Sequence, residues 1–483
     1  MPMHMLKGSG EELRGELLNQ GFIFNPKKRN DLMNYIMEEL PKRRVIAATK
    51  VGWDSDNTFV LPNQVIGGKD VVFQSEIPGE NEFKTKGSLE GWQKNIGKLS
   101  HGNIPCMISI CMALAGPLLK KVNRKQGGGI HWVGDSSSGK STVVEIAASI
   151  WGSSDIIQSW NATSNGLEGV LAMRNDICLF LDEIDEASPQ EVGKIVYMIT
   201  NGHGKRRAGR TGNARDIQRW RTMTISTGER TLSSIMNDIG KQPNSGQLVR
   251  LLNIPAGFDH GVFSNLHGFP DGRSLADHFK ALCEQDYGHI GPAFIHFLIK
   301  EKRDLPGALS GLVEAFCKEG IFSKLESRAA GTLLVGAMAG ELAIEYGLLP
   351  WSKGDALSAM KVAFNKWREA QGSRQSEHTC IVENISSFIV KQDIRFSLYR
   401  DGKDISTVNN RAGWYEEKNG ERVYMFLPEA LEEAAGKFDR NRVVRAVREA
   451  GWLVDHDDGR YTKRTRTPMG SKGLYYIRVR DQD

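Results

Sequence analysis

A glycine-rich turn between an apolar run and a helical pattern constrains this fold more than any other feature of the sequence. Residues 134–141 read GDSSSGKS and match the pattern GxxxxGK[ST] at every required position. The apolar residues 130–133 predict a strand before this turn, and a helix is expected to begin at Ser141. In such a loop the backbone N–H groups point inward at phosphates, and the N-terminus of the following helix strengthens that field. The segment therefore predicts a phosphate-binding loop in an α/β protein.

The side chains of this loop have separate expected roles in binding a nucleoside triphosphate. Lys140 is expected to reach the β and γ phosphates, and the Ser141 hydroxyl is expected to ligate Mg²⁺. A chance turn rich in glycine and serine is the alternative, but it explains neither the strand before the loop nor the helix after it. The expected ATP-binding residues of the loop are Gly134, Asp135, Ser136, Ser137, Ser138, Gly139, Lys140, Ser141 and Thr142.

Two acidic residues follow a second strongly apolar run, residues 177–181. Asp182 is expected to hold Mg²⁺ directly or through water, and Glu183 is expected to orient and polarise the water that attacks the γ-phosphate. A hydrophobic run that ends in two acids is a weak pattern by itself. Downstream of a complete phosphate loop, in an alternation typical of a parallel sheet, it indicates the second half of an ATPase site.

Two further positions complete the expected catalytic set. Residues 223–227 predict a strand that ends in hydroxyls, one of which would hydrogen-bond the attacking water or the γ-phosphate. Thr227 is favoured over Ser226 for this role, and a capping hydroxyl is the alternative. Arg250 stands immediately before the apolar residues 251–254. A guanidinium at the edge of an ATPase core can project into a neighbouring subunit's site, although a surface arginine in an ion pair is the alternative.

Positive charge is concentrated in two regions, although the net charge of the whole chain is only +5. Residues 201–221 contain seven basic residues and one acid, and the last region, residues 439–483, is also basic. Glycines interrupt the first region, which favours a turn or hairpin tip from which basic side chains reach phosphates. The expected DNA-binding residues are Lys205, Arg206, Arg207 and Arg210. A solvated basic loop is the alternative, and the C-terminal group Lys463, Arg464 and Arg466 would then contact DNA.

The order of predicted elements divides the 483 residues into four domains. Residues 1–100 combine short β-like runs with polar turns and are expected to form a mixed α/β domain. Residues 101–260 alternate strands with helices, which predicts a parallel sheet covered on both faces. Residues 261–371 are helical, and residues 372–483 have the helix-then-ribbon order of a winged-helix, DNA-binding domain, with a basic loop joining the ribbon. The core strands are expected at residues 130–133, 156–159, 177–181, 223–226 and 251–254.

Two features bear on the cellular location. The apolar residues 104–119 contain two prolines and a serine and are shorter than the roughly 20 residues that a membrane-spanning helix needs, so we expect a buried core helix and no membrane partner. The six cysteines form no CxxC pair and show no zinc-ligand spacing. Small buried thiols are typical of a reducing compartment, and a cytoplasmic location is therefore expected.

Together, these motifs resemble the proteins of domain of unknown function 927 (DUF927), which are helicase-like ATPases of phages, plasmids and mobile bacterial cassettes. The resemblance covers roughly residues 40 to 370. The first motif is generic, whereas the ordered set is specific to the family. The stretches that carry the resemblance are residues 132–141, 163–169, 200–205, 226–229 and 247–252, with residues 337–343 similar to a later lid motif.

This family is in turn similar to AAA+ ATPases of the clade that includes mini-chromosome-maintenance helicases. The likeness implies a ring, a hexamer, with ATP between subunits and a pore hairpin formed by residues 201–219. It also implies a lid sensor that touches the γ-phosphate, for which Arg328 is the candidate. The implied function is an ATP-driven helicase or translocase on single-stranded or forked DNA, in replication of a phage or mobile element. Nothing here resembles a primase site, so priming, where it is needed, would come from another chain, and a separate primase or loader is an expected partner. An ATP-switched, DNA-binding assembly factor is the alternative.

Overall fold

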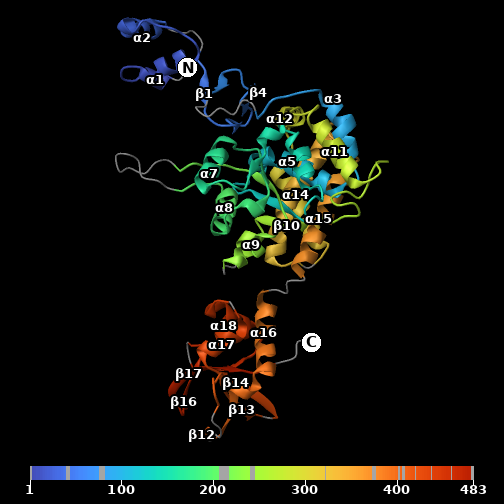
Figure 1. Ribbon diagram of the computed structural model, residues 1–483. Coiled ribbons are helices and arrows are strands. Elements are labelled where there is room, and N and C mark those ends of the chain that lie inside the picture. Colours follow the sequence, from blue (N-terminus) through green and yellow to red (C-terminus); the bar gives the residue numbers. More distant parts are fainter. Residues whose placement is uncertain are drawn as a thin grey trace. The chain divides into compact units, whose positions relative to one another are not determined.

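The computed structural model of the protein forms two compact units, Met1–Arg368 and Glu369–Asp483 (Figure 1). The structure describes residues 3–39, 44–74, 82–205, 217–239, 245–320, 322–372, 377–400, 403–404, 408–418, 420–436, 438–457 and 460–479.

The first unit begins with two helices and two small sheets. Their bounds are α1 (Glu11–Asn19), α2 (Arg29–Glu38), β1 (Ile46–Ala48), β2 (Gly52–Trp53), β3 (Phe59–Leu61), β4 (Gln64–Ile66) and β5 (Val71–Phe73). β1 pairs with β5 in parallel, whereas β2, β3 and β4 form an antiparallel sheet. The indole N–H of Trp53 donates to the Pro117 carbonyl at 2.9 Å, and the Trp53 backbone N–H donates to the buried Asp176 carboxylate at 3.1 Å. These bonds attach the small antiparallel sheet to the central part of the unit.

A five-stranded parallel sheet forms the centre of the first unit. Its strands are β6 (Gly128–Val133), β7 (Gln158–Ser159), β8 (Cys178–Asp182), β9 (Met223–Gly228) and β10 (Leu251–Pro255), and their order across the sheet is β10-β6-β9-β8-β7. Every neighbouring pair is parallel. The predicted parallel sheet is therefore confirmed. Because the carboxyl ends of parallel strands meet at one edge, the segments after β6, β8 and β9 lie close together.

Helices cover both faces of this sheet. The helices of this part are α3 (Leu89–Trp92), α4 (Lys98–Ser100), α5 (Ile104–Lys121), α6 (Lys140–Ala148), α7 (Ser164–Met173), α8 (Pro189–Asn201), α9 (Leu232–Asp238) and α10 (Ser245–Leu248). Alternate residues of β8 join different cores: Phe180 packs into the cluster that contains α5 and α6, while Leu179 and Leu181 pack into the cluster that contains α7 and α8. This alternation explains why the strand is apolar at every position before Asp182.

Helix α5 is the predicted core helix of residues 104–119. By length and composition alone it could span a membrane, but most of it is buried inside the first unit, against α6, α14 and the central sheet. Gly116 permits its close approach to β8, because a Cβ built there would lie 2.6 Å from the Ile177 carbonyl carbon. The helix therefore belongs to the protein core.

Five further helices complete the first unit. They are α11 (Gly272–Cys283), α12 (Ile290–Lys300), α13 (Leu305–Lys318), α14 (Lys324–Glu345) and α15 (Asp355–Gly372), the last of which crosses into the second unit. A capping box at Ser323 and Glu326 starts α14. Small residues let α14 pack tightly on α5: a Cβ at Gly340 would meet the Cys111 sulfur at 2.4 Å.

The second unit packs three helices on a mixed sheet. Its elements are α16 (Glu377–Lys391), β11 (Phe396–Arg400), β12 (Lys403–Asp404), β13 (Gly413–Lys418), β14 (Glu421–Phe426), α17 (Pro428–Ala435), α18 (Arg440–Glu449), β15 (Leu453–Asp455), β16 (Lys463–Thr467) and β17 (Gly470–Ile477). The strand order is β12-β11-β13-β14-β17-β15, and β16 pairs with β17 outside this path. The three helices share one hydrophobic core with β14 and β17.

The basic residues of this unit that were predicted to form a loop form a strand instead. Lys463, Arg464 and Arg466 lie on strand β16, which forms an antiparallel hairpin with β17. Basic and threonine residues alternate along β16, and Thr467 at its end is buried. The strand has a charged outer face and little hydrophobic signal, so composition alone suggested a loop.

Candidate nucleotide-binding site

The phosphate loop joins the end of β6 to the start of α6. Ser137 and Gly139 have positive φ angles of 60° and 93°, so the chain turns through the left-handed region twice. Gly139 is also constrained by space, because a Cβ built there would lie 2.8 Å from a methyl group of Val262. The loop therefore has the tight curvature that its sequence pattern predicts.

Lys140 lies across the inside of this loop. Its ammonium donates to the Gly134 and Asp135 carbonyls at 2.8 and 2.6 Å and to the Ser138 hydroxyl at 3.3 Å. The side chain is buried. Because α6 begins at Lys140, the unpaired N–H groups of its first turn are added to the positive field of the ammonium.

Asp182 and Thr227 meet at the carboxyl edge of the sheet. Asp182 is the last residue of β8 and Thr227 the penultimate residue of β9, and the register pairs the residues before them, Leu181 and Ser226. The Thr227 hydroxyl donates to Asp182 Oδ1 through a short contact, and it accepts from the Glu183 backbone N–H at 3.3 Å. Of the two hydroxyls considered from the sequence, Thr227 is the one in contact with the acidic pair.

Glu183 has an exposed carboxyl on a strained backbone. Its φ of 60° is unusual for a residue with a side chain and turns the chain sharply after β8. A hydrogen bond with Glu186 raises the pKa of the Glu183 carboxyl, and the negative charge of Asp182 raises it further. Asp185 accepts from the Glu229 backbone N–H at 2.7 Å and so joins the turn after β8 to the turn after β9.

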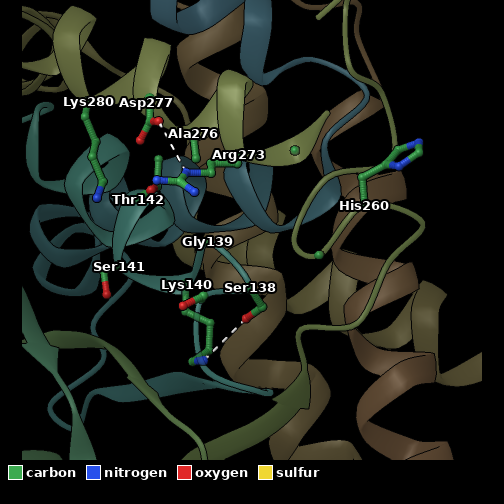
Figure 2. Close-up of a pocket in the computed structure, with 13 residues that line it drawn as sticks. Ser138, Gly139, Lys140, Ser141, Thr142, His260, Arg273, Ala276, Asp277 and Lys280 are labelled. Atoms are coloured by element: carbon green, nitrogen blue, oxygen red, sulfur yellow. Dashed lines mark hydrogen bonds and ion pairs between the residues drawn. The ribbon is translucent and has the colours of Figure 1, made fainter. Parts of the chain in front are cut away.

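A cavity of about 610 Å³ opens beside the phosphate loop (Figure 2). Residues of the loop and of α6, from Ser137 to Thr142, form one side. The other side is formed by α11 and by the turn that precedes it. The lining residues from this side are His260, Gly261, Gly272, Arg273, Ala276, Asp277 and Lys280.

Sequence reasoning missed the contribution of α11. Figure 2 shows the Lys280 side chain extending from α11 in the direction of Ser141. Arg273 lines the same cavity and lies 4.0 Å from Asp277, one turn along the helix. The charged positions 273, 277 and 280 follow helical spacing, a pattern that is usually a solvated helix face. With Lys140, this gives three cations and one acid around the cavity, which favours a polyanionic ligand.

The turn before α11 supports the phosphate loop directly. The Val262 backbone N–H donates to the Ser138 carbonyl at 2.9 Å. The Lys366 ammonium of α15 donates to the Gly257 carbonyl at 3.0 Å and lies 4.2 Å from the Phe258 ring centroid. Residues 257–262 thus connect α15 to the phosphate loop.

Arg250, the expected trans-acting arginine, and Arg328, the expected lid sensor, do not line the cavity of their own chain, and both roles stay predictions. Arg250 is half-buried, and its guanidinium lies 4.9 Å from the ring of Tyr197 on α8. Among the described residues it has no ion-pair partner and does not line the cavity. Arg328 is exposed near the start of α14, one turn before Thr332, which packs against Gly128 at the amino end of β6. The phosphate loop follows the opposite end of β6, so Arg328 does not reach this site in its own chain.

The two ends of the basic segment after α8 pair with each other. His203 and Arg219 form an antiparallel bridge, and the Gly204 N–H donates to the Gln218 carbonyl at 3.0 Å. Lys205 is exposed at the end of this pairing. Arg206, Arg207 and Arg210 lie outside the described residues. The paired ends agree with the expected hairpin at its base.

The model of the family described as "Domain of unknown function (DUF927)" matches residues 1–219. The match confirms the predicted resemblance to this family over those residues, which contain the stretches 132–141, 163–169 and 200–205. It begins earlier than the resemblance suggested and ends before the remaining stretches.

A solved structure described as "SCCmec type IV Cch - active helicase" is similar to the chain, with a TM-score of 0.73 and 19% sequence identity. The alignment covers 99% of this chain and 87% of that one. At this identity the likeness establishes a shared fold. No curated protein matches the chain.

Proposed function

We propose that this protein is an ATP-driven, ring-forming DNA helicase or translocase of the AAA+ class that serves replication of a phage or mobile element. The contact between Thr227 and Asp182, at the same sheet edge as the Lys140 loop, carries the proposal. A phosphate loop, an acid that holds Mg²⁺ and a residue that orients the attacking water are recurring parts of enzymes that transfer a phosphoryl group to water. The fold shared with a structure described as an active helicase supports the DNA-acting part.

In the proposed reaction, Lys140 exchanges its loop carbonyls for β and γ phosphate oxygens. Ser141 and Asp182 fit a Mg²⁺ site, because Mg²⁺ in nucleotide sites typically takes one or two protein oxygens and completes its shell with phosphates and water. In the part of the chain that the structure describes, no cluster of three His, Cys, Asp or Glu side chains offers a separate metal site. When bound, Mg²⁺ neutralises charge on the β and γ phosphates.

Glu183 is the proposed general base. It takes a proton from the attacking water as the water oxygen bonds to the γ-phosphorus and the bond to the bridging oxygen of ADP breaks. Thr227 holds Asp182 and the Glu183 backbone in a fixed relation through two hydrogen bonds. The raised pKa of Glu183 brings its basicity closer to the neutral range, in which proton transfer from water is more favourable.

The AAA+ and ring assignments draw on two further observations. β9 is inserted between the phosphate-loop strand β6 and the acidic strand β8, an order that agrees with the implied AAA+ class. Arg250 lies outside the cavity of its own chain and is held against Tyr197, which supports a role in the site of a neighbouring copy. We therefore propose a hexamer with ATP between subunits.

DNA is the proposed partner of two basic surfaces. One is the basic segment after α8, whose ends pair at His203 and Arg219 and which exposes Lys205. The other lies on the second unit, which we propose to be a winged-helix domain: α18 exposes Arg445 and Arg448, and the hairpin of β16 and β17 exposes Arg464 and Arg466. The free thiols of the six cysteines support a cytoplasmic location. A separate primase would supply priming where it is needed, and a separate loader is the other proposed protein partner.

The alternative is an ATP-switched assembly factor that binds DNA without separating strands. It is favoured by the division into two units, since a separate basic unit could bind DNA while the nucleotide controls assembly. A forked-duplex unwinding assay with ATP tests the two, with Lys140→Ala as the control that cannot hold the phosphates. ATP-dependent strand separation by the natural chain supports the helicase. Hydrolysis without strand separation supports the switch, and no ATP binding overturns both.

A further inference from the structure

Three buried polar side chains form a hydrogen-bonded chain beneath the site. The indole N–H of Trp160 donates to the Ser226 hydroxyl oxygen at 2.8 Å, and Ser226 Oγ lies 2.9 Å from His131 Nδ1. His131 Nε2 lies 3.0 Å from the Arg230 carbonyl. His131 and Ser226 are fully buried, and Trp160 is 1% exposed. Polar groups this deep in a core require partners, and each of these has one.

The donor and acceptor in each of these hydrogen bonds follow from the chemistry of the partners. A carbonyl oxygen only accepts, so His131 Nε2 carries the proton that it donates to Arg230. Burial lowers the pKa of His131 to about 4, so the ring is neutral at pH 7 and Nδ1 is an acceptor. The Ser226 hydroxyl therefore donates to His131 while accepting from Trp160. Every donor has one acceptor, which fixes the orientation of the Ser226 side chain.

These hydrogen bonds join the segments that carry the proposed catalytic groups. His131 is on β6, three residues before the phosphate loop, and its register partner on β9 is Ser226. Trp160 follows β7, and its backbone N–H donates to the Asp182 carbonyl at 3.2 Å. Thr227 directly follows Ser226, so its side chain lies on the opposite face of the sheet, where it contacts Asp182. The buried chain and the catalytic contact therefore hold opposite faces of one short segment.

We propose that His131 and Trp160, acting through Ser226, are positioning residues that hold the Thr227 hydroxyl in place to contact Asp182. This inference rests on the proposed ATP hydrolysis, but it assigns a role to residues that do not line the nucleotide cavity. Without the Ser226 hydroxyl, the Trp160 N–H and His131 Nδ1 lose their shared partner, and the end of β9 is free to shift. Small displacements of this kind reduce turnover more than they reduce nucleotide binding.

The test is ATP turnover by Ser226→Ala in the full chain, with Thr224→Val as the matched control. Thr224 lies two residues earlier on the same face of β9, and its buried hydroxyl has no hydrogen-bond partner among the described residues. We expect kcat to fall roughly tenfold or more in Ser226→Ala, by misplacement of Thr227, with the KM for ATP nearly unchanged. Thr224→Val is expected to retain the natural kcat.

Two further variants separate positioning from folding. Trp160→Phe removes the N–H donor but retains most of the ring volume, and it serves if Ser226→Ala does not fold. His131→Asn keeps an acceptor for the Ser226 hydroxyl and should retain more turnover than His131→Leu at equal thermal stability. Natural kcat in Ser226→Ala and Trp160→Phe, with the natural chain active, overturns the inference and leaves the proposed function standing. An inactive natural chain overturns both.

Discussion

The hydroxyl of Thr227 donates to the carboxylate of Asp182 while it accepts from the backbone N–H of Glu183, so one side chain joins the two acids expected to perform different tasks. Because Asp182 ends β8 and Thr227 lies on the neighbouring strand, this contact depends on the parallel register of the two strands. The acid proposed for Mg²⁺ and the acid proposed as general base are therefore held in a fixed relation before any ligand is bound.

Thr227→Val should lower ATP turnover with little change in ATP affinity. Valine keeps the shape of threonine but removes both hydrogen bonds, so Asp182 and the turn at Glu183 lose a common partner. Loss of one well-placed hydrogen-bond donor in such a site typically costs about a hundredfold to a thousandfold in kcat. Steady-state hydrolysis and nucleotide titration measure the two quantities. Thr227→Ser, which keeps the hydroxyl, should retain most of the activity, and equal activity of both variants would contradict the assignment.

The acid side of the pH profile should depend on Glu186. The hydrogen bond with Glu186 raises the pKa of the Glu183 carboxyl, and a general base must be ionised to act. Hydrolysis should therefore fall as the pH drops through this raised pKa. Glu186→Gln removes a negative neighbour, lowers the pKa of Glu183, and should move the acid limb of kcat to lower pH. Glu191→Gln, which changes a half-buried acid paired with Lys194, is the control and should leave the profile unchanged.

The central sheet and the phosphate loop were predictable because their signals are local. The glycine pattern of residues 134–141 and the apolar runs that end at Asp182 and Thr227 specify strand, turn and helix within a few residues of each group. Parallel strands then bring their carboxyl ends to one edge whatever the details of the connections.

The cavity wall formed by α11 was not predictable in the same way. Arg273 and Lys280 lie on an amphipathic helix whose pattern is the same whether its polar face meets solvent or a ligand. The packing of residues 257–262 on the phosphate loop decides that this polar face lines the cavity. The position of Arg328 was unpredictable for a similar reason, because the place of the start of α14 depends on how α14 packs against α5. Its role as a sensor stays a prediction.

Removal of the α11 cations should weaken nucleotide binding, whereas removal of Arg328 should not weaken binding within one chain. Each of Arg273 and Lys280 is exposed, so we expect the loss of about 0.5–1 kcal/mol per residue, or roughly a twofold to fivefold rise in the Kd for ATP. Titration of Lys280→Ala, Arg273→Ala and Arg328→Ala with ATP gives the comparison. If only Arg328→Ala weakens binding, the cavity beside α11 is not the nucleotide site.

Arg250→Ala should bind ATP but barely hydrolyse it. Arginines that act across a subunit boundary contribute roughly 10³ to 10⁵ in rate by stabilising charge on the transferred phosphoryl group. Mixing Arg250→Ala with Lys140→Ala should restore activity, because some interfaces then combine an intact loop with an intact arginine. Tyr197→Leu, which removes the ring beneath the guanidinium, should lower turnover less. Absence of recovery, once subunit exchange has been demonstrated, would instead assign Arg250 a structural role.

Two matched double variants should identify the surface that holds single-stranded DNA. Lys205→Ala with Arg206→Ala removes two charges at the segment after α8, and Arg464→Ala with Arg466→Ala removes two from the exposed face of β16. The first pair should weaken single-strand binding and lower the salt slope by about 0.7 per lost phosphate contact. Basal ATP turnover should persist in the first pair, because Lys205 does not line the nucleotide cavity, but its stimulation by DNA should fall. Unchanged affinity, salt slope and stimulation in the first pair, with losses in the second, would transfer the DNA-binding role to the β16 hairpin.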